Sequence, residues 1–188
     1  MDNFKDFSAK LFPLEDFEIE LFEALFVPIS VKKKECLFEE ATTIQDIFFL
    51  SEGVFRCFAI KDGKEITADI IAEPILFTDL LAIRRNTKAY IHLQALEDAT
   101  CFKANFKSLE QLMFQNINIK RFVFKLYEQI YMNGVKRQVS FIYDSQAERY
   151  QDFLAQYEAV IDKIPNQVIA SYLGLRPETL SRIRQKVK

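Results

Sequence analysis

The first part of the chain carries apolar residues at three- and four-residue steps, the spacing of one face of an α-helix. We therefore predict helix over residues 4–26, divided by Pro13 into two short helices and ended by Pro28. The apolar positions are Phe4, Phe7, Leu11, Leu14, Phe17, Leu21, Phe22 and Leu25.

From about residue 29 to residue 103 the pattern changes to short runs rich in β-branched and aromatic residues, which favour strands. Asp62-Gly63 between two such runs is a strong hairpin signal. Closely spaced short strands are typical of a small antiparallel sandwich or barrel. A short apolar insert, residues 74–83, interrupts them and is compatible with helix. The predicted strands are 29–31, 36–40, 46–53, 54–60, 65–71 and 89–98.

Residues 106–144 return to helical spacing with a long apolar stripe, which needs a partner surface. We expect the helix's own domain to cover one part and a second copy of the chain another. A helix packed only within its own chain is the alternative. Another helix is predicted over residues 146–161, and two short ones follow Pro165. The stripe comprises Ile119, Phe122, Val123, Leu126, Ile130, Val135, Val139 and Ile142.

Residues 164–184 have the pattern of a helix-turn-helix. Gly174 falls in the turn between the two short helices, where a positive φ is expected and glycine adopts it at little cost. Ala170 is small where the second helix passes, and Pro177 suits that helix's first turn. The expected buried positions are Val168, Ile169, Leu173, Leu175, Leu180 and Ile183.

The outer face of the second helix predicts contacts with DNA in the major groove. Arg182 can donate two hydrogen bonds to guanine, and Glu178 can accept one from cytosine. A structural helical hairpin with a solvated face is the alternative. Expected phosphate contacts are Gln167, Thr179 and Ser181, and Gln185 is also left on the outside.

Charge supports this placement. The 188-residue chain has a net charge of −2, but from Lys163 onward it holds six basic residues and one acid, Glu178, a net charge of +5. A basic end on an acidic body is what a local phosphate-binding face would have.

A length of 188 residues suits one large domain or two small ones. The 28% of charged residues argues against a membrane protein, and the first residues lack the basic and apolar regions of a signal peptide, so we expect a cytoplasmic protein.

Candidate chemistry is sparse. Cys36, Cys57 and Cys101 are odd in number and widely spaced, which suggests reduced thiols rather than disulfides or a zinc site. His92 is the only histidine, too few to build a metal site. We find no nucleophile–base pair and no phosphate-binding loop, and we expect neither enzyme activity, nor a cofactor, nor a metal.

The chain resembles the Crp/Fnr family of regulators over nearly its whole length. The similarity is strongest in Ala147-Glu-Arg-Tyr and in the segment 169–184, and looser in 48–53, 62–65 and 95–98. The resemblance implies an α+β fold: an N-terminal antiparallel β-roll like the cyclic nucleotide-binding jelly roll, a long dimerisation helix and a C-terminal helix-turn-helix domain.

The departures from the family pattern concern both sites. Thr78-Asp79 stands where members that bind cyclic AMP have the Gly-Glu pair for the ribose. The phosphate-binding arginine is replaced by Ala89, beside Tyr90, with Lys88 one residue away. On the DNA side, Pro177 replaces the first base-reading arginine and Arg176 precedes it. The β-hairpin wing is expected to be absent or truncated.

The sequence thus predicts a β-roll sensor over 1–115, a dimerisation helix over 116–144 and a helix-turn-helix domain over 145–188. The function implied is a sequence-specific transcription regulator with an effector-sensing β-roll that does not respond to cyclic AMP. Its expected partners are double-stranded DNA and a second copy, with an unidentified small-molecule effector and RNA polymerase as further candidates and no membrane. The alternative is a small-molecule or protein-interaction β-roll whose helix-turn-helix no longer reads DNA.

Overall fold

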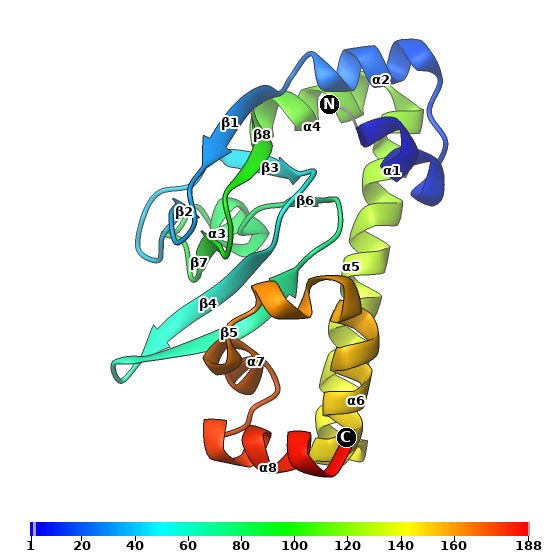
Figure 1. The fold of residues 1–188 in the computed structure, drawn as a ribbon. Coiled ribbons are helices and arrows are strands. Elements are labelled where there is room, and N and C mark those ends of the chain that lie inside the picture. The colour runs from blue at the N-terminus through cyan, green and yellow to red at the C-terminus, as the bar shows by residue number, and fades with distance from the viewer. Residues whose placement is uncertain (2, 188) are drawn as a thin grey trace.

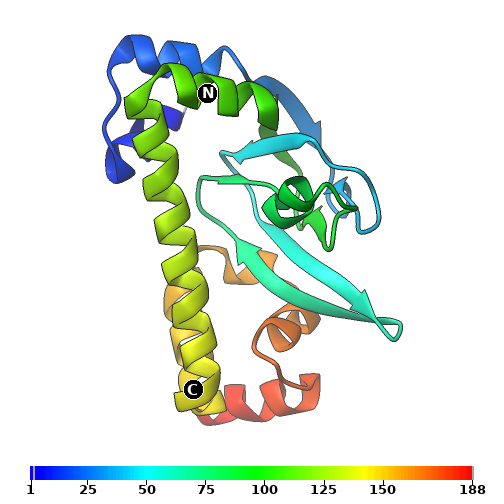
Figure 2. The same cartoon turned by 180° about the vertical axis from the view of Figure 1, so that it is seen from behind.

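The computed structural model describes Met1 and residues 3–187, with side chains as far as Gln185. Helix α5 runs along one side of a β-roll, from the N-terminal helices at one end to the C-terminal helices at the other (Figures 1 and 2). The helices are α1 Phe4–Leu11, α2 Asp16–Glu23, α3 Leu80–Arg85, α4 Phe106–Gln115, α5 Ile117–Tyr143, α6 Gln146–Tyr157, a 3-10 helix Glu158–Lys163, α7 Asn166–Tyr172 and α8 Pro177–Val187.

The β-roll consists of two four-stranded antiparallel sheets, in the orders β1-β8-β3-β6 and β2-β7-β4-β5. The hairpin β4–β5 turns at Asp62 and Gly63, which both have positive φ, as the Asp-Gly pair predicts. The strands are β1 Val27–Val31, β2 Cys36–Phe38, β3 Asp46–Leu50, β4 Phe55–Lys61, β5 Lys64–Ile71, β6 Ile75–Phe77, β7 His92–Ala95 and β8 Ala99–Asn105.

Several sequence expectations need correction. Pro28 does not end a helix: α2 stops at Glu23 and Pro28 lies in β1, paired with Phe102. The insert 74–83 begins as strand β6 before it turns into α3. The single predicted strand 89–98 is only His92–Ala95, and β8, which the pattern did not reveal, follows it. Residues 106–144 form two helices because Asn116 leaves the helical conformation and caps α5 with its side chain.

Three hydrophobic clusters hold the molecule together. One fills the space between the two sheets, with residues of both, such as Phe48 of β3 and Leu93 of β7. A second joins the outer face of the first sheet to α1, α2, α4 and α5. A third joins Val54, Ile70 and Leu96 of the β-roll to α6, α7 and α8. Helices therefore cover the outer face of the first sheet and pack against one part of the second.

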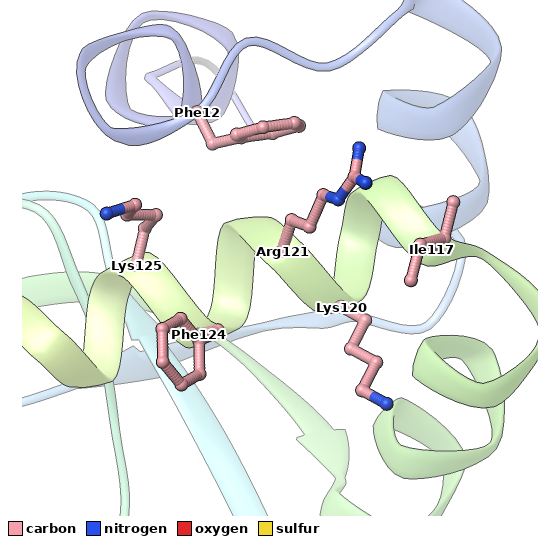
Figure 3. Close-up of a pocket in the computed structure, with 6 residues that line it drawn as sticks. All are labelled: Phe12, Ile117, Lys120, Arg121, Phe124 and Lys125. Atoms are coloured by element: carbon pink, nitrogen blue, oxygen red, sulfur yellow. The ribbon is translucent and has the colours of Figure 1, made fainter.

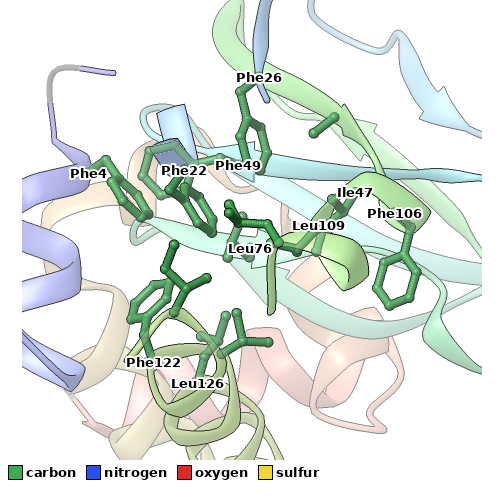
Figure 4. Close-up of a cluster of buried hydrophobic side chains, with 14 of the residues drawn as sticks. Phe4, Phe22, Phe26, Ile47, Phe49, Leu76, Phe106, Leu109, Phe122 and Leu126 are labelled. Carbon is green, nitrogen blue, oxygen red and sulfur yellow. The ribbon is translucent and has the colours of Figure 1, made fainter. Parts of the chain in front are cut away.

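Phenylalanine rings dominate the second cluster (Figure 4). Phe4 of α1 stacks on Phe22 of α2 with ring centroids 4.3 Å apart. It also meets Phe49 of β3 and Phe122 of α5 edge to face, at 5.5 and 5.6 Å. Such aromatic pairs add stability beyond their buried area, and here one ring ties the N-terminal helix to the sheet and to α5.

Within the described residues no strand follows α6, so the described part of the C-terminal region consists of helices alone. None of the described helices combines the length and apolar character that a membrane-spanning segment requires.

A buried carboxylate links α2 to the start of α5. Glu18 is 2% exposed, and its carboxylate accepts three hydrogen bonds of 3.0 Å, from the Glu15 backbone N–H and from the side-chain amides of Asn116 and Asn118. Burial alone would raise the pKa of Glu18, but the three hydrogen bonds outweigh it and hold the pKa below its ordinary value of 4.5.

Glu18→Gln is expected to lower the free energy of unfolding by about 1–3 kcal/mol at neutral pH, because its amide nitrogen cannot accept these hydrogen bonds. The depressed folded-state pKa means that the parent's stabilisation is present above 4.5 and is lost as the pH falls through the folded-state pKa. Urea unfolding at a series of pH values should show the gap between parent and variant closing in acid. A gap that stays constant with pH would contradict this role, and exposed Glu73→Gln serves as the control.

Candidate nucleic-acid interface

Helices α7 and α8 form a helix-turn-helix around Gly174. Gly174 has φ +67°, as its place in the turn predicts, and a Cβ added there would lie 2.9 Å from a ring carbon of Phe141 in α5. The Leu175 N–H closes the turn on the Ala170 carbonyl at 2.8 Å. The glycine is required both by the backbone conformation and by the close approach of α5.

The inner face of this unit is buried as the spacing predicts. Leu180 of α8 is 2% exposed, and Ile183 is half-buried against the same cluster. Helix α6 packs against this inner face through Tyr150, Phe153 and Tyr157. The buried residues of α7 and the following turn are Val168, Ile169, Ala170 and Leu173.

The outer face of α8 is a continuous polar stripe. Glu178, Ser181, Arg182 and Gln185 follow one another at i, i+3, i+4 and i+7, and all four are exposed. Among the described residues, neither Glu178 nor Arg182 forms an ion pair. An arginine and a glutamate presented side by side on one helix face are the groups that read guanine and cytosine edges.

The other predicted contacts flank this stripe. Arg176 and Pro177 are exposed at the start of α8, next to Glu178. Thr179 is half-buried, which leaves its side chain less accessible than the stripe. Gln167 is exposed on the first turn of α7. The structure therefore gathers the α8 residues on one surface, and Gln167 belongs to the neighbouring helix.

Not every basic residue of the C-terminal region faces outward. Arg184 donates to the Tyr150 hydroxyl at 3.0 Å and to the Asn166 side chain at 2.6 Å, so it ties α8 to α6 and α7. Lys163 pairs with Glu97 at 3.0 Å. A net charge summed over the segment overstates its DNA-facing charge. The helical spacing contains the clue for Arg184, which stands four residues after buried Leu180.

The predicted ligand-binding residues lie around α3, and Asp79 joins their two segments. Its carboxylate accepts from the Ala82 N–H at 3.0 Å, as the N-cap of α3, and from the Tyr90 N–H at 2.7 Å. Asp79 is 6% exposed. The neighbouring Thr78 hydroxyl donates to the Asp46 carbonyl at 2.7 Å. Both side chains therefore bind backbone groups of their own chain.

The second ligand segment is tied to the loop before β3. Ala89 is buried and exchanges backbone hydrogen bonds with Ala41 and Thr42, at 2.9 and 2.8 Å. The Lys88 ammonium donates to the Thr43 hydroxyl at 2.7 Å. Thr87 donates to the exposed Tyr90 hydroxyl at 3.2 Å. Every polar group predicted for a ligand is thus already engaged within the β-roll.

The remaining candidate groups have structural surroundings. His92 stacks on Phe58 with ring centroids 4.6 Å apart, and its Nε2 lies 3.6 Å from Glu40. Burial raises the pKa of the Cys101 thiol to about 12 and that of Cys57 well above its usual value, which disfavours the thiolate. Among the described residues, no three His, Cys, Asp or Glu side chains gather as metal ligands would.

Helix α5 has a second exposed surface, with a groove of about 360 Å³ beside it (Figure 3). Phe12 overhangs the helix on one side of the groove. Ile117, Phe124 and Tyr131, at seven-residue spacing, are 59, 65 and 70% exposed. They lie opposite the buried Ile119, Phe122, Val123 and Leu126. The groove is lined by Phe12, Ile117, Lys120, Arg121, Phe124 and Lys125.

Comparison with known proteins agrees with this architecture. Residues 28–116 match the cyclic nucleotide-binding domain family. None of the curated proteins compared with the chain matches it in sequence. Among solved structures, FixK2 from Bradyrhizobium japonicum superposes with a TM-score of 0.74 at 16% identity, covering 86% of this chain and 84% of that one.

Two other solved structures cover slightly more of the chain. The c-di-GMP responsive global regulator CLP from Xanthomonas campestris has a TM-score of 0.69 at 13% identity, with 92% of this chain and 91% of that chain covered. A protein named as a Crp/Fnr-family transcriptional regulator, from Eubacterium rectale, has a TM-score of 0.69 at 16% identity, covering 92% and 83%. The resemblance to the Crp/Fnr family is therefore confirmed at the level of the fold.

The position of Asp79 generates a stability prediction. Asp79→Asn keeps one acceptor oxygen and leaves either the Ala82 or the Tyr90 N–H facing an amide that cannot accept. The expected loss is about 1–3 kcal/mol in the free energy of unfolding, measured by urea denaturation. The exposed Asp152→Asn on α6 is the matched control. A variant at position 79 as stable as the parent would show that the hydrogen bonds to the Ala82 and Tyr90 N–H groups do not stabilise the fold.

Proposed function

We propose that this chain, which has a cyclic nucleotide-binding family domain at residues 28–116 and the fold of Crp/Fnr regulators, is a sequence-specific DNA-binding transcription regulator. The observation that carries the proposal is the stripe of Glu178, Ser181, Arg182 and Gln185 on α8. The stripe is exposed while the opposite side of the same helix is buried, which is how a recognition helix presents its reading face.

In this proposal, different parts of the chain sense the effector and bind DNA. The β-roll of residues 1–115 would be the sensor, and residues 145–188 the DNA-binding part. Asp79 and Ala89 occupy the positions that hold cyclic AMP in responsive members, and both are engaged internally. We therefore propose that any effector is a molecule other than cyclic AMP, and that adding cyclic AMP leaves the melting temperature of the protein unchanged.

A random-library DNA selection with the purified protein tests the proposal. The expected result is an enriched motif with two-fold symmetry and half-sites about one helical turn, or about 34 Å, apart. Arg182→Ala should weaken binding to that site by about 1–3 kcal/mol and relax the preference at one position of each half-site. The charge-matched control is Arg85→Ala, an exposed arginine on α3, which lies in the β-roll away from α8 (Figure 1).

The failure modes of this experiment are distinct. Enrichment of a motif that Arg182→Ala reads unchanged would contradict base reading by Arg182 and leave DNA binding intact. No enrichment from the parent protein would contradict the regulator proposal and favour the alternative, a β-roll interaction module.

We also propose that the active form is a homodimer joined along α5 over residues 116–144. Exposed aromatic and aliphatic side chains at seven-residue spacing supply one of the two apolar positions of a coiled-coil heptad. A second α5 would cover Ile117, Phe124 and Tyr131, which nothing in their own chain buries. The carbon-lined groove beside Phe12 widens the surface that a partner helix can cover.

Tyr131→Asp is expected to turn the dimer into a monomer, because a desolvated aromatic side chain at an interface centre contributes about 2 kcal/mol or more. Sedimentation velocity over a concentration series should show association weakened at least about 30-fold. Gln129→Asp, exposed on another side of α5, should leave the dimer intact. A Tyr131→Asp protein that dimerises like the parent would place the seam elsewhere.

A further inference from the structure

The β-roll and the helix-turn-helix do not have separate cores where they meet. Val54, Ile70 and Leu96 of the roll are buried in the same cluster as the inner faces of α6, α7 and α8. A unit that swings freely on a hinge would keep its own core and a polar, hydrated boundary. Here the helix-turn-helix is packed onto the sheet through α6 and α7.

The contact is made at an unpaired sheet edge. Strand β5 is the last strand of its sheet, so the outward N–H and C=O groups of that edge have no neighbouring strand. The Thr67 N–H donates to the Ser171 hydroxyl of α7 at 2.8 Å, and that hydroxyl donates to the Glu65 carbonyl at 3.2 Å. The Tyr157 hydroxyl of α6 donates to the Ile70 carbonyl at 2.9 Å.

The Glu65 carbonyl, the Thr67 N–H and the Ile70 carbonyl lie on the same side of strand β5. Residues 65 and 67 are two apart, so they face the same edge of the strand. A bulge opposite Cys57 and Phe58 then shifts the register of β5 before Ile70. With that shift the Ile70 carbonyl also points outward. Two hydroxyl groups from the helix-turn-helix region therefore satisfy three of the outward groups of the β5 edge.

Helix α5 closes the arrangement from the other side. The Arg137 guanidinium lies 4.3 Å from the Tyr172 ring centre and donates to the Tyr172 carbonyl at 2.6 Å, at the end of α7. Phe141 packs against the turn at Gly174. Helix α7 and its turn are thus held between the β5 edge and α5, and α8 projects beyond them (Figures 1 and 2).

We propose that the edge of strand β5 positions the recognition helix for DNA, with Ser171 and Tyr157 as positioning residues that never touch DNA. The docked state leaves Glu178 and Arg182 exposed, so the contact presets the reading face and does not cover it. Loosening the contact lowers the fraction of molecules in the DNA-competent state and weakens binding by that fraction. Reciprocity requires DNA binding to strengthen the β5 contact in return. This inference rests on the proposed DNA-binding function.

The test compares the parent dimer with Ser171→Ala, the double variant Ser171→Ala/Tyr157→Phe and the control Ser108→Ala, whose half-buried serine lies on α4. The first readout is hydrogen exchange of the Thr67 amide, resolved by NMR, in DNA-free protein. It should be slow in the parent and in the control, and at least about tenfold faster in Ser171→Ala, which lacks the acceptor. Saturating the parent with its selected DNA site should slow this exchange further.

The second readout is affinity for the selected site. The double variant should bind at least about threefold more weakly than the parent while it selects the same base sequence, because no base contact is altered. Arg182→Ala, in contrast, changes the selected sequence. This separates a positioning role from a reading role.

Each outcome decides the matter. A Thr67 amide that exchanges freely in the parent, or a double variant that binds as tightly as the parent, would overturn the inference and leave the proposed function standing. A parent that selects no DNA sequence would overturn the proposed function and, with it, the positioning role, whatever the Thr67 amide does.

Discussion

Helix α5 depends on burying one side of its first half against a phenylalanine-rich core, and most of the fold is arranged around that contact. Phe122 meets Phe4 and Phe22 edge to face, so the same rings that fix α5 also fix both N-terminal helices. Most of the stability of a helix in a protein comes from packing of its apolar face, and the 27-residue α5 has such a face in its first half. Packing on the outer face of the first sheet fixes the orientation of α5. The far end of α5, held in this orientation, meets the C-terminal helices.

The second half of α5 makes a different set of contacts. Beyond Ile130 the helix no longer packs on this cluster, and its contacts pass to α7 and the turn through Arg137 and Phe141. The opposite edge of α7 rests on β5 through Ser171. Placement of α8 is therefore shared between a sheet edge and a helix, and neither belongs to the helix-turn-helix itself. The uncovered surface of α5 carries the exposed Ile117, Phe124 and Tyr131 among basic side chains.

The segment around α3 is held by hydrogen bonds within the β-roll. The Asp79 carboxylate caps α3 and also accepts from the Tyr90 N–H. Each carboxylate oxygen already accepts one backbone N–H, and the side chain is only 6% exposed, so a ligand hydroxyl has little access to it. The β-roll keeps its shape because its interior is filled by its own residues from both sheets.

Local chemistry explains which parts of this structure were predictable. Asp62-Gly63 and Gly174 define turns that only a few residue types adopt, so the hairpin and the helix-turn-helix were evident from the chain. The stripe from Glu178 to Gln185 likewise follows from helical spacing. The missed elements lacked such markers. Strand β8 carries no turn signal that separates it clearly from the run before it, and the break at Asn116 depends on a capping side chain within a continuous apolar pattern.

By itself, then, the sequence determined the succession of helical, strand-rich and helical regions, the two tight turns and the exposed stripe on α8, since these depend on backbone preference and spacing over a few residues. Only the tertiary structure decided that Arg184 and Lys163 are structural, that Asp79 is buried, and that α6 and α7 dock on the β5 edge. Each of these last features joins residues far apart in the chain. No local pattern encodes such a contact, because the free energy that selects it comes from burying surfaces against each other once both have formed.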